Sequence, residues 1–342
     1  MWRGLALAAL LAGPAMAETR ITHTDFAALD GWAEDDHGAA LDAFRATCGD
    51  MTSPDWRTLC AVAKDAEDAR AFFELFFQPV VVEDGTPMLF TGYFEPELRG
   101  SRYRSPAYPH PVYRMPDEAR TGPWLTRREI EEGGALNGRG LEIAYVDNAV
   151  DLFFLQIQGS GRIKLDDGGV IRLGYGGSNG RNYSSIGQKL IERGIYEPHQ
   201  VSAQVIRSWV ARNPEAGANL LRENDSYVFF RTVDEVPADQ GPLGAMNRSI
   251  TTMRSIAVDP SFTPLGAPVW IEKDGAAPLR RLMIAQDTGS AIKGAQRADI
   301  FYGTGASAGR KAGRVRDGGR MVVLLPIQRA FAMLPERLDG AP

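Results

Sequence analysis

Short apolar runs, separated by Gly, Pro and Asp turns at fairly even spacing, constrain the fold of this chain more than any other feature. From Tyr227 onward these runs cover residues 227–230, 255–258, 268–271, 281–285 and 321–325. Such a series predicts an antiparallel or mixed barrel rather than alternating βαβ units. The 37 Gly and 21 Pro residues agree with this prediction, because both residue types favour turns. We therefore expect a mainly β protein.

The N-terminal part of the chain has a different, helical pattern. Between residues 25 and 77 apolar side chains recur at intervals of three and four positions. Ser53 precedes Pro54 and predicts a helix start, with Ser53 as the cap and Pro54 at the first helical position. The remaining patterns predict strands at 80–82, 88–93, 150–157 and 170–173, and helices at 185–193 and 200–212.

Residues 1–17 have the pattern of a secretory signal peptide. A cationic start is followed by a short apolar run, and Ala15-Met16-Ala17 fits the small-x-small rule for cleavage before Glu18. The run is too short to cross a bilayer, and no later segment approaches the length of a membrane span. No cysteine directly follows the apolar run of the signal peptide, so the sequence predicts no site for N-terminal lipidation. We expect an exported protein in the periplasm, held by the cell wall itself or peripheral to the outer membrane.

Charge and cysteine content exclude several classes of function. The formal net charge of −5 argues against a nucleic-acid partner, because no basic surplus is present to neutralise phosphates. Cys48 and Cys60 are the only two cysteines, and in an oxidising compartment they predict a local disulfide, with two buried thiols as the alternative. The 4 His residues show no ligand spacing, so we predict neither a metal site nor a cofactor.

Two carboxylates in the segment 285–305 are candidates for acid-base chemistry. Asp287 ends a predicted strand, and Asp299 follows among small residues and glycines, which let the backbone approach a ligand closely. A carboxyl group that stays protonated near neutral pH can donate a proton to the leaving oxygen of an acetal. The alternative is that both aspartates accept backbone N–H groups in turns.

A second candidate site combines amides, hydroxyls, Tyr rings and glycines, which suit a sugar-binding surface. It covers residues 156–162 and 174–183. The candidate residues in it are Gln156, Gln158, Gly159, Ser160, Asn179 and Tyr183. Plain turns are the alternative. A nucleotide-binding loop is disfavoured by the missing strand–GxGxxG–helix context, and Ser160 lacks the G-x-S-x-G elbow of a serine hydrolase.

Several ordered motifs resemble the membrane-bound lytic transglycosylase A (MltA) family of murein-degrading enzymes. They are FTGYFEP (90–96), DLFFLQIQGSG (151–161), GPLG (241–244), RSIAVDP (254–260), PLG (264–266) and the run 287–313. The C-terminal part is also similar to the wider three-aspartate (3D) barrel domain, with Asp259, Asp287 and Asp299 as its aspartates.

The resemblance implies a double-psi β-barrel domain that carries the N-terminal helices and is built from residues 18–105 and 237–342. It also implies a second β-rich, glycan-binding domain, inserted at residues 106–236. It implies non-hydrolytic cleavage of the β-1,4 bond between N-acetylmuramic acid and N-acetylglucosamine in peptidoglycan, leaving 1,6-anhydromuramoyl ends. Asp299 would be the single general acid/base, supported by Asp287. The implied partners are glycan strands and other cell-wall enzymes. The matching segments also place further substrate-binding candidates near the acids: Tyr93, Asp259, Thr288, Gly289 and Lys293.

Two other functions remain open at this stage. A lysozyme-like hydrolase would use Asp299 as the acid and Asp287 as the base that activates water. A non-catalytic glycan-binding barrel would bind sugar without turnover. The mass of the products separates the first from a transglycosylase, and the effect of Asp299→Asn on turnover separates the second.

Overall fold

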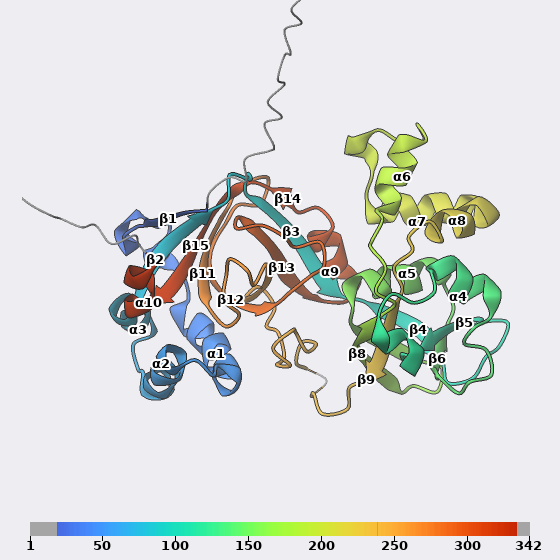
Figure 1. Cartoon of the computed structure of the whole chain (residues 1–342), viewed down its shortest axis with the longest axis horizontal. Coiled ribbons are helices and arrows are strands. Elements are labelled where there is room, and N and C mark those ends of the chain that lie inside the picture. The colour runs from blue at the N-terminus through green and yellow to red at the C-terminus, as the bar shows by residue number, and fades with distance from the viewer. Residues whose placement is uncertain (1–18, 238, 334–342) are drawn as a thin grey trace, which may run out of the picture.

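The computed structural model describes residues 19–237 and 239–333, in which the chain forms two β-sheets that lie side by side (Figure 1). The larger sheet has the order β1-β2-β15-β11-β12-β10-β13-β3-β14 and the smaller has the order β5-β6-β4-β7-β8-β9. Strands β4 to β9 lie between β3 and β10 in the chain, so the smaller sheet is an insertion into the larger one. The predicted mainly β fold, a barrel with an inserted second sheet and N-terminal helices, is confirmed.

The larger, barrel-like sheet combines strands from both ends of the chain. Its strands are β1 (Arg20–His23), β2 (Phe77–Glu83), β3 (Leu89–Glu95), β10 (Ser255–Val258), β11 (Pro268–Lys273), β12 (Leu279–Asp287), β13 (Arg297–Thr304), β14 (Arg316–Asp317) and β15 (Gly319–Pro326). Most neighbours are antiparallel, but β10 is parallel to β12 and β3 is parallel to β13. The strands at 255–258, 268–271, 281–285 and 321–325 were all predicted. Helices α9 (Gly305–Ala312) and α10 (Ile327–Ala332) follow β13 and β15.

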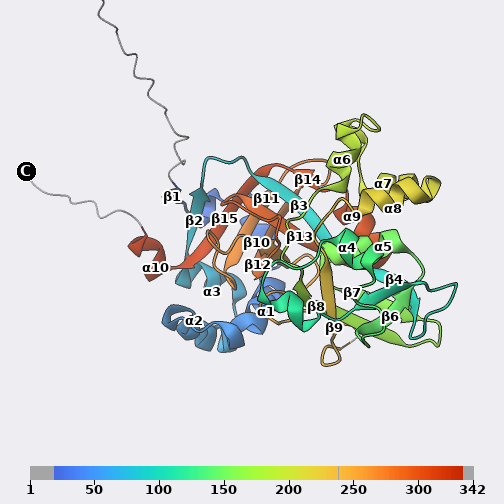
Figure 2. The ribbon, with the colours of Figure 1, turned by 45° about the vertical axis from the view of Figure 1, so that its right-hand side comes forward.

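The smaller sheet carries its own helices and hydrophobic core (Figure 2). Its strands are β4 (Glu97–Ser101), β5 (His110–Tyr113), β6 (Glu142–Val146), β7 (Gly161–Leu165), β8 (Val170–Ser178) and β9 (Val228–Thr232). The accompanying helices are α4 (Arg127–Gly133), α5 (Ala149–Gln158), α6 (Ile186–Glu192), α7 (Ala203–Arg212) and α8 (Pro214–Leu221). β4 pairs with β6 and β7, so this sheet includes residues before position 106.

The segment 150–157, predicted as a strand, is helix α5, and the prediction was wrong. A short continuous apolar run reads equally well as a buried strand or a buried helix. The flanking residues decide between them. The side chain of Asn148 accepts hydrogen bonds from the backbone N–H groups of Val150 and Asp151, which caps the helix at its start. Gly159 ends the helix in the left-handed conformation, with φ of 76°.

Three N-terminal helices pack against the barrel: α1 (His37–Thr47), α2 (Pro54–Asp65) and α3 (Ala69–Phe76). Their aromatic side chains are core residues, and the Phe44 ring contacts the rings of Phe72, Phe73 and Phe77. α2 begins with Pro54, as predicted. Ser53 occupies the N-cap position, but its side chain makes no capping hydrogen bond, so the predicted cap was only partly right.

Cys48 and Cys60 form a disulfide, with their Cα atoms 5.4 Å apart. Cys48 caps the end of α1 and Cys60 lies in α2, so the bridge fastens the first two helices together.

Replacing both cysteines (Cys48→Ser with Cys60→Ser) is expected to lower the free energy of unfolding by about 3 kcal/mol, because the bridge closes a loop of 12 positions in the unfolded chain. Urea unfolding of the oxidised protein measures the difference. The reduced wild-type protein is the control and should unfold at the same urea concentration as the double variant. Equal stability of oxidised and reduced protein would contradict the expectation.

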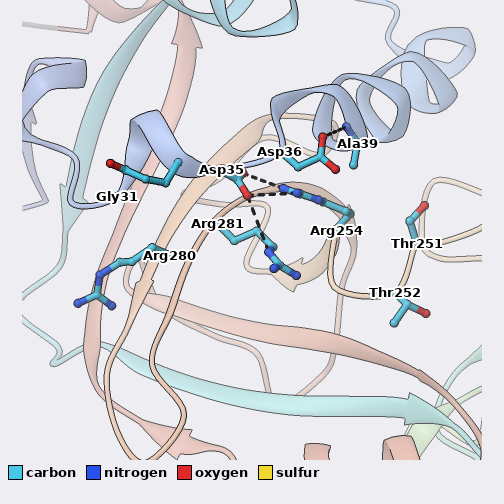
Figure 3. A pocket seen from close by; sticks show the side chains of 10 residues that line it. Gly31, Asp35, Asp36, Ala39, Thr251, Thr252, Arg254, Arg280 and Arg281 are labelled. Carbon is cyan, nitrogen blue, oxygen red and sulfur yellow. Dashed lines mark hydrogen bonds and ion pairs between the residues drawn. The ribbon is translucent and has the colours of Figure 1, made fainter.

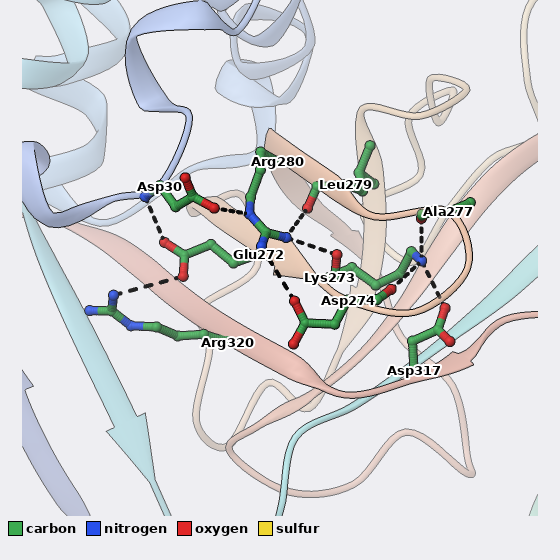
Figure 4. A network of polar contacts seen from close by, with 9 residues as sticks. All are labelled: Asp30, Glu272, Lys273, Asp274, Ala277, Leu279, Arg280, Asp317 and Arg320. Atoms are coloured by element: carbon green, nitrogen blue, oxygen red, sulfur yellow. Dashed lines mark hydrogen bonds and ion pairs between the residues drawn. The ribbon is translucent and has the colours of Figure 1, made fainter.

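Ion pairs fasten the N-terminal segment to the barrel strands. The buried Asp35 carboxylate accepts hydrogen bonds from Arg254 at 2.8 and 3.1 Å, and Arg281 lies 3.9 Å away (Figure 3). At the β11–β12 hairpin, Arg280 binds Asp30 at 2.5 Å (Figure 4). In the same network the buried Lys273 Nζ donates to Asp317 and to two backbone carbonyls, which uses its three N–H groups. These clusters are structural.

Within the described part of the chain, no helix is long and apolar enough to cross a membrane. The predicted signal peptide, residues 1–17, lies outside the described residues.

Candidate active site

Four residues on neighbouring barrel strands form a row across the sheet. Asp299 in β13 is the register partner of Thr91 in β3 on one side and of Ala257 in β10 on the other. Ala257 is in turn the register partner of Asp287 in β12. Because neighbouring strands lie about 4.8 Å apart, the two aspartates flank Ala257 at a Cα separation of about 10 Å. The sheet therefore brings together the two carboxylates that the sequence singled out.

A β-bulge aligns Asp287 with this row. Ile256 pairs with Ala285, but the next residue, Ala257, pairs with Asp287, so Gln286 is the extra residue of β12. Gln286 is fully buried and hydrogen-bonds to Ser255. Bulges change the direction of one side chain relative to the sheet and are common beside active sites. Here the bulge places a carboxylate, rather than the Gln286 amide, next to Ala257.

Asp299 has a carboxyl group suited to proton donation. Thr91 Oγ1 donates a hydrogen bond to Oδ1 of Asp299 at 2.6 Å, and Arg297 Nη2 donates to the same Thr91 oxygen at 2.9 Å. Among residues 19–237 and 239–333, no hydrogen bond reaches Oδ2. Burial raises the pKa of Asp299 to about 6, against the lowering effects of the Thr91 hydrogen bond and the Arg297 charge, while the Asp287 charge adds to the rise. With this pKa, roughly a tenth of Asp299 is protonated at pH 7 and about half at pH 6.

Asp287 is held by three donors. Its Oδ1 accepts the backbone N–H groups of Ala245 and Thr288, both at 2.9 Å, and its Oδ2 accepts the Tyr93 hydroxyl at 3.0 Å. Burial raises the pKa of Asp287, and these three hydrogen bonds oppose the rise. Burial and the two neighbouring carboxylates raise the pKa of Tyr93 well above its usual value, so its hydroxyl stays protonated and remains a donor.

Side chains alternate between the two faces of β3, which explains why Thr91 and Tyr93 between them contact the two aspartates. Alternate side chains of a strand point to opposite faces, so these two share the face of the aspartates while Gly92 faces away. A Cβ at Gly92 would lie 2.8 Å from the Cα of Ala312 in α9. α9 therefore packs directly on the strand behind the site, and a larger side chain at position 92 would displace it.

Asp259, predicted as a substrate-binding residue, has a structural role. It is 5% exposed, and its carboxylate accepts the backbone N–H groups of Ser261 at 3.1 Å and Gly294 at 3.0 Å. Burial would raise the pKa of Asp259, but these hydrogen bonds lower it overall. Asp259 therefore accepts backbone N–H groups, the role that the sequence left open as an alternative for Asp287 and Asp299. It anchors the loop between β12 and β13, on which Thr288 and Lys293 are exposed and Gly289 is half-buried.

Part of the second candidate surface lies beside the acids. Gln158 Oε1 accepts the backbone N–H of Phe94 at 3.1 Å, one residue beyond Tyr93. Gly159 and Ser160 follow Gln158 and are partly exposed. The ring of Tyr175, 56% exposed, lies 4.0 Å from where a Cβ of Gly159 would be. The end of α5 therefore joins the inserted sheet to the strand that contacts both aspartates.

Two predicted sugar-binding residues lie in the interior instead. Asn179 is fully buried and hydrogen-bonds to the backbone of Leu125, Asp225, Tyr227 and Arg181, so no group is left for a sugar. Gln156 is 4% exposed and faces the buried Tyr227. Both side chains lie in the core of the inserted unit rather than on its surface. Tyr183 is 43% exposed, and no contact in the structure links it to the acids.

Sequence reasoning missed Thr91, Arg297 and Ala245. Thr91 could have been found, since it lies two positions before Tyr93 in the same strand and therefore shares its face. The Ala245 N–H had no signal in the sequence, because a backbone group carries none.

A pocket of about 730 Å³ lies away from the two aspartates, between α1 and the start of β10 (Figure 3). It is lined by Arg254, Arg281 and Asp35, among other residues. Arg254 and Asp35 bind each other there, so their charges are already paired within the protein.

Comparisons with known proteins find relatives for both parts of the chain. Residues 89–231 match the family model of the MltA specific insert domain, and residues 254–325 match that of the 3D domain. The membrane-bound lytic murein transglycosylase A of Vibrio cholerae is 37% identical over 264 residues, which cover 73% of this chain and 70% of that protein. The Escherichia coli K12 protein of the same name is 36% identical over 245 residues, covering 69% of this chain and 65% of that protein.

Solved structures give the same result. The crystal structure of a membrane-bound lytic murein transglycosylase from Agrobacterium tumefaciens has a TM-score of 0.82 and 32% identity, and covers 91% of this chain and 99% of that one. The E. coli MltA structure with bound chitohexaose has a TM-score of 0.71 and 30% identity, and covers 85% of this chain and 90% of that one.

The barrel with its inserted sheet places the chain among glycan-cleaving enzymes built on a 3D-type barrel. Within that class the chain belongs to the membrane-bound lytic murein transglycosylase A family. It is a lytic transglycosylase that acts on peptidoglycan.

Proposed function

We propose that Asp299 alone supplies the acid and the base for cleavage of the bond between N-acetylmuramic acid and N-acetylglucosamine. The observation that carries this is the environment of Asp299, whose burial raises its pKa to about 6 and whose Oδ2 is unoccupied by any described protein group. Protonated Asp299 donates its proton to the glycosidic oxygen as the anomeric carbon becomes oxocarbenium-like. The N-acetylglucosamine side leaves as the alcohol.

The second half of the reaction uses the same carboxyl group. The Asp299 carboxylate removes the proton from the C6 hydroxyl of the muramoyl residue, and that oxygen attacks the anomeric carbon of its own ring. This forms the 1,6-anhydro bond and restores protonated Asp299. An attacking group tethered to the substrate has a high effective concentration, so the mechanism needs neither a bound water nor an enzyme nucleophile. Thr91 orients the Asp299 carboxyl group through its 2.6 Å hydrogen bond.

The contacts of Asp287 favour this mechanism over hydrolysis. A hydrolase of the inverting type needs a second carboxylate that is free to accept a proton from water. Both Asp287 oxygens already accept hydrogen bonds, from Tyr93, Ala245 and Thr288, which weakens this carboxylate as a base for water. We assign Asp287 the role of a fixed negative charge that raises the pKa of Asp299 and stabilises the positive anomeric centre.

The inserted sheet is proposed as the glycan-binding domain. β4 pairs within that sheet, so we place the start of this domain at Glu97 rather than at residue 106. The proposed sugar contacts are Gln158, Gly159 and Ser160, together with Tyr93, Thr288, Gly289 and Lys293 on the barrel side. Support comes from the Gln158–Phe94 hydrogen bond, which joins the two surfaces, and from the E. coli relative, whose structure contains chitohexaose.

We propose that the enzyme is exported and works in the periplasm. The support is the signal-peptide pattern of residues 1–17. Recovery of the activity in the periplasmic fraction would agree with this, whereas recovery only in the cytoplasmic fraction would contradict it.

The mass of the cleavage products tests the reaction type. Purified sacculi digested with the enzyme are expected to release fragments with 1,6-anhydromuramoyl ends, which weigh one water less than reducing ends. A lysozyme digest of the same sacculi is the control and gives reducing ends. Reducing ends alone in the enzyme digest would refute transglycosylation.

A further inference from the structure

A buried carboxylate lies where the chain leaves the barrel. Glu95 is the last residue of β3, and the chain enters the inserted sheet two residues later, at β4. The Glu95 side chain is completely buried. An ionised carboxylate in the interior is unfavourable unless cations or hydrogen-bond donors pair with it, so the partners of Glu95 indicate why it is there.

The partners of Glu95 come from both parts of the molecule. Its Oε2 accepts hydrogen bonds from Nε of Arg162 at 2.9 Å and from the Thr304 hydroxyl at 2.7 Å. Arg172 Nε lies 3.9 Å from the Oε1 atom. The two arginines belong to β7 and β8 of the inserted sheet, whereas Thr304 ends β13, the strand that carries Asp299. One carboxylate therefore joins the two units.

The same arginines also hold the segment that returns from the inserted sheet to the barrel. Nη2 of Arg162 and Nη2 of Arg172 donate to the carbonyl oxygen of Gln240, at 2.9 and 2.8 Å. Nη1 of Arg172 donates to the carbonyl oxygen of Gly241 at 3.3 Å. The guanidinium groups thus link Glu95 to the start of the segment 240–245.

The segment 240–245 is packed too closely to absorb a displacement at Gln240. A Cβ at Gly241 would overlap the carbonyl oxygen of Ile250, and a Cβ at Gly244 would lie 2.7 Å from the carbonyl oxygen of Gln286. Close-packed backbone of this kind transmits a shift along its length. At its end, the N–H of Ala245 donates to the Asp287 carboxylate at 2.9 Å.

We propose that Glu95 and Arg172 are positioning residues that fix the inserted domain against the barrel and, through the segment 240–245, hold Asp287 in place beside Asp299. This inference rests on the proposed role of Asp287. Neither residue touches the substrate. They act by setting the position of the Ala245 N–H, and therefore the orientation of the Asp287 carboxylate.

The variant Arg172→Met tests the proposal, because it keeps the length of the side chain and removes its donors. We expect the kcat for murein cleavage per folded molecule to fall by about tenfold to a hundredfold, as for other small misplacements of reacting groups. Arg172→Lys should restore part of the loss. The matched control is Lys164→Met: Lys164 lies on β7, pairs with Glu97 at 3.2 Å, and should leave kcat unchanged.

A double-mutant cycle shows whether Arg172 acts through Asp287. In the Asp287→Asn background, Arg172→Met is expected to lower kcat by much less than in the wild-type background. If Arg172→Met does not fold, Glu95→Gln replaces it in the same cycle. If Arg172→Met and Glu95→Gln each keep the wild-type kcat and lose only thermal stability, the proposal is overturned. An active Asp299→Asn enzyme would instead overturn the proposed function, whatever Arg172→Met does.

Discussion

Asp299→Asn is expected to lower the rate of murein cleavage by about a thousandfold or more, because it removes the only group proposed to donate and accept the proton. The variant keeps the shape of the side chain and can still accept the Thr91 hydrogen bond. Its affinity for glycan strands should therefore stay close to that of the wild type. The release of anhydromuramoyl products, followed by mass spectrometry, and the binding of the variant to sacculi are the two measurements.

The same substitution is expected to stabilise the fold. Because the pKa of Asp299 is about 6 in the folded state, above the unfolded value of about 3.9, ionisation of this group costs stability as the pH rises through this range. Asn does not ionise, so at pH 8 the variant should gain on the order of 2 kcal/mol, after allowance for the partly exposed side chain.

Below about pH 3 the gain should vanish, since Asp299 is then protonated in both the folded and the unfolded state. Urea unfolding at pH 8 and at about pH 3 measures it. Lower stability of Asp299→Asn at pH 8 would show that Asp299 is a structural acceptor rather than a destabilised acid. Asp259→Asn is the matched control, because the pKa of Asp259 is lowered and its loss should reduce stability at pH 8.

The pH dependence of kcat/KM is expected to show a limb near pH 6 above which activity declines. The reaction begins with protonated Asp299, so the active fraction falls about tenfold per pH unit once the pH exceeds its pKa. Thr91→Val removes a hydrogen bond that lowers this pKa and should shift the limb to higher pH. Asp287→Asn removes a negative charge that raises the pKa and should shift the limb to lower pH.

The opposite directions of these two shifts distinguish Asp299 from other titrating groups. Both variants are also expected to be slower at their optimum, since Thr91 orients the acid and Asp287 stabilises positive charge. A profile that rises with pH through this range, or shifts in the same direction for both variants, would contradict the assignment of Asp299 as the acid. Initial rates on a soluble glycan fragment give the profile.

The sequence by itself determined the strands of the barrel and singled out two aspartates as candidate acids. The runs at 255–258, 268–271 and 321–325 were found because β-strands buried in a barrel are short, apolar and bounded by turn residues. Asp287 and Asp299 were found because they end or follow such strands among glycines. These signals are local, so they can be read from neighbouring positions in the chain.

Only the tertiary structure decided what each polar residue does. It made 150–157 a helix, since the Asn148 cap and the left-handed Gly159 outweighed an ambiguous apolar run. It showed Asn179 and Asp259 to be structural, because their hydrogen bonds go to backbone groups distant in sequence. The placement of Asp287 depends on a bulge and on the Ala245 N–H, and the burial that raises the pKa of Asp299 comes from several strands packed together. Register, burial and backbone donors arise only when distant segments meet, so residue types alone do not encode them.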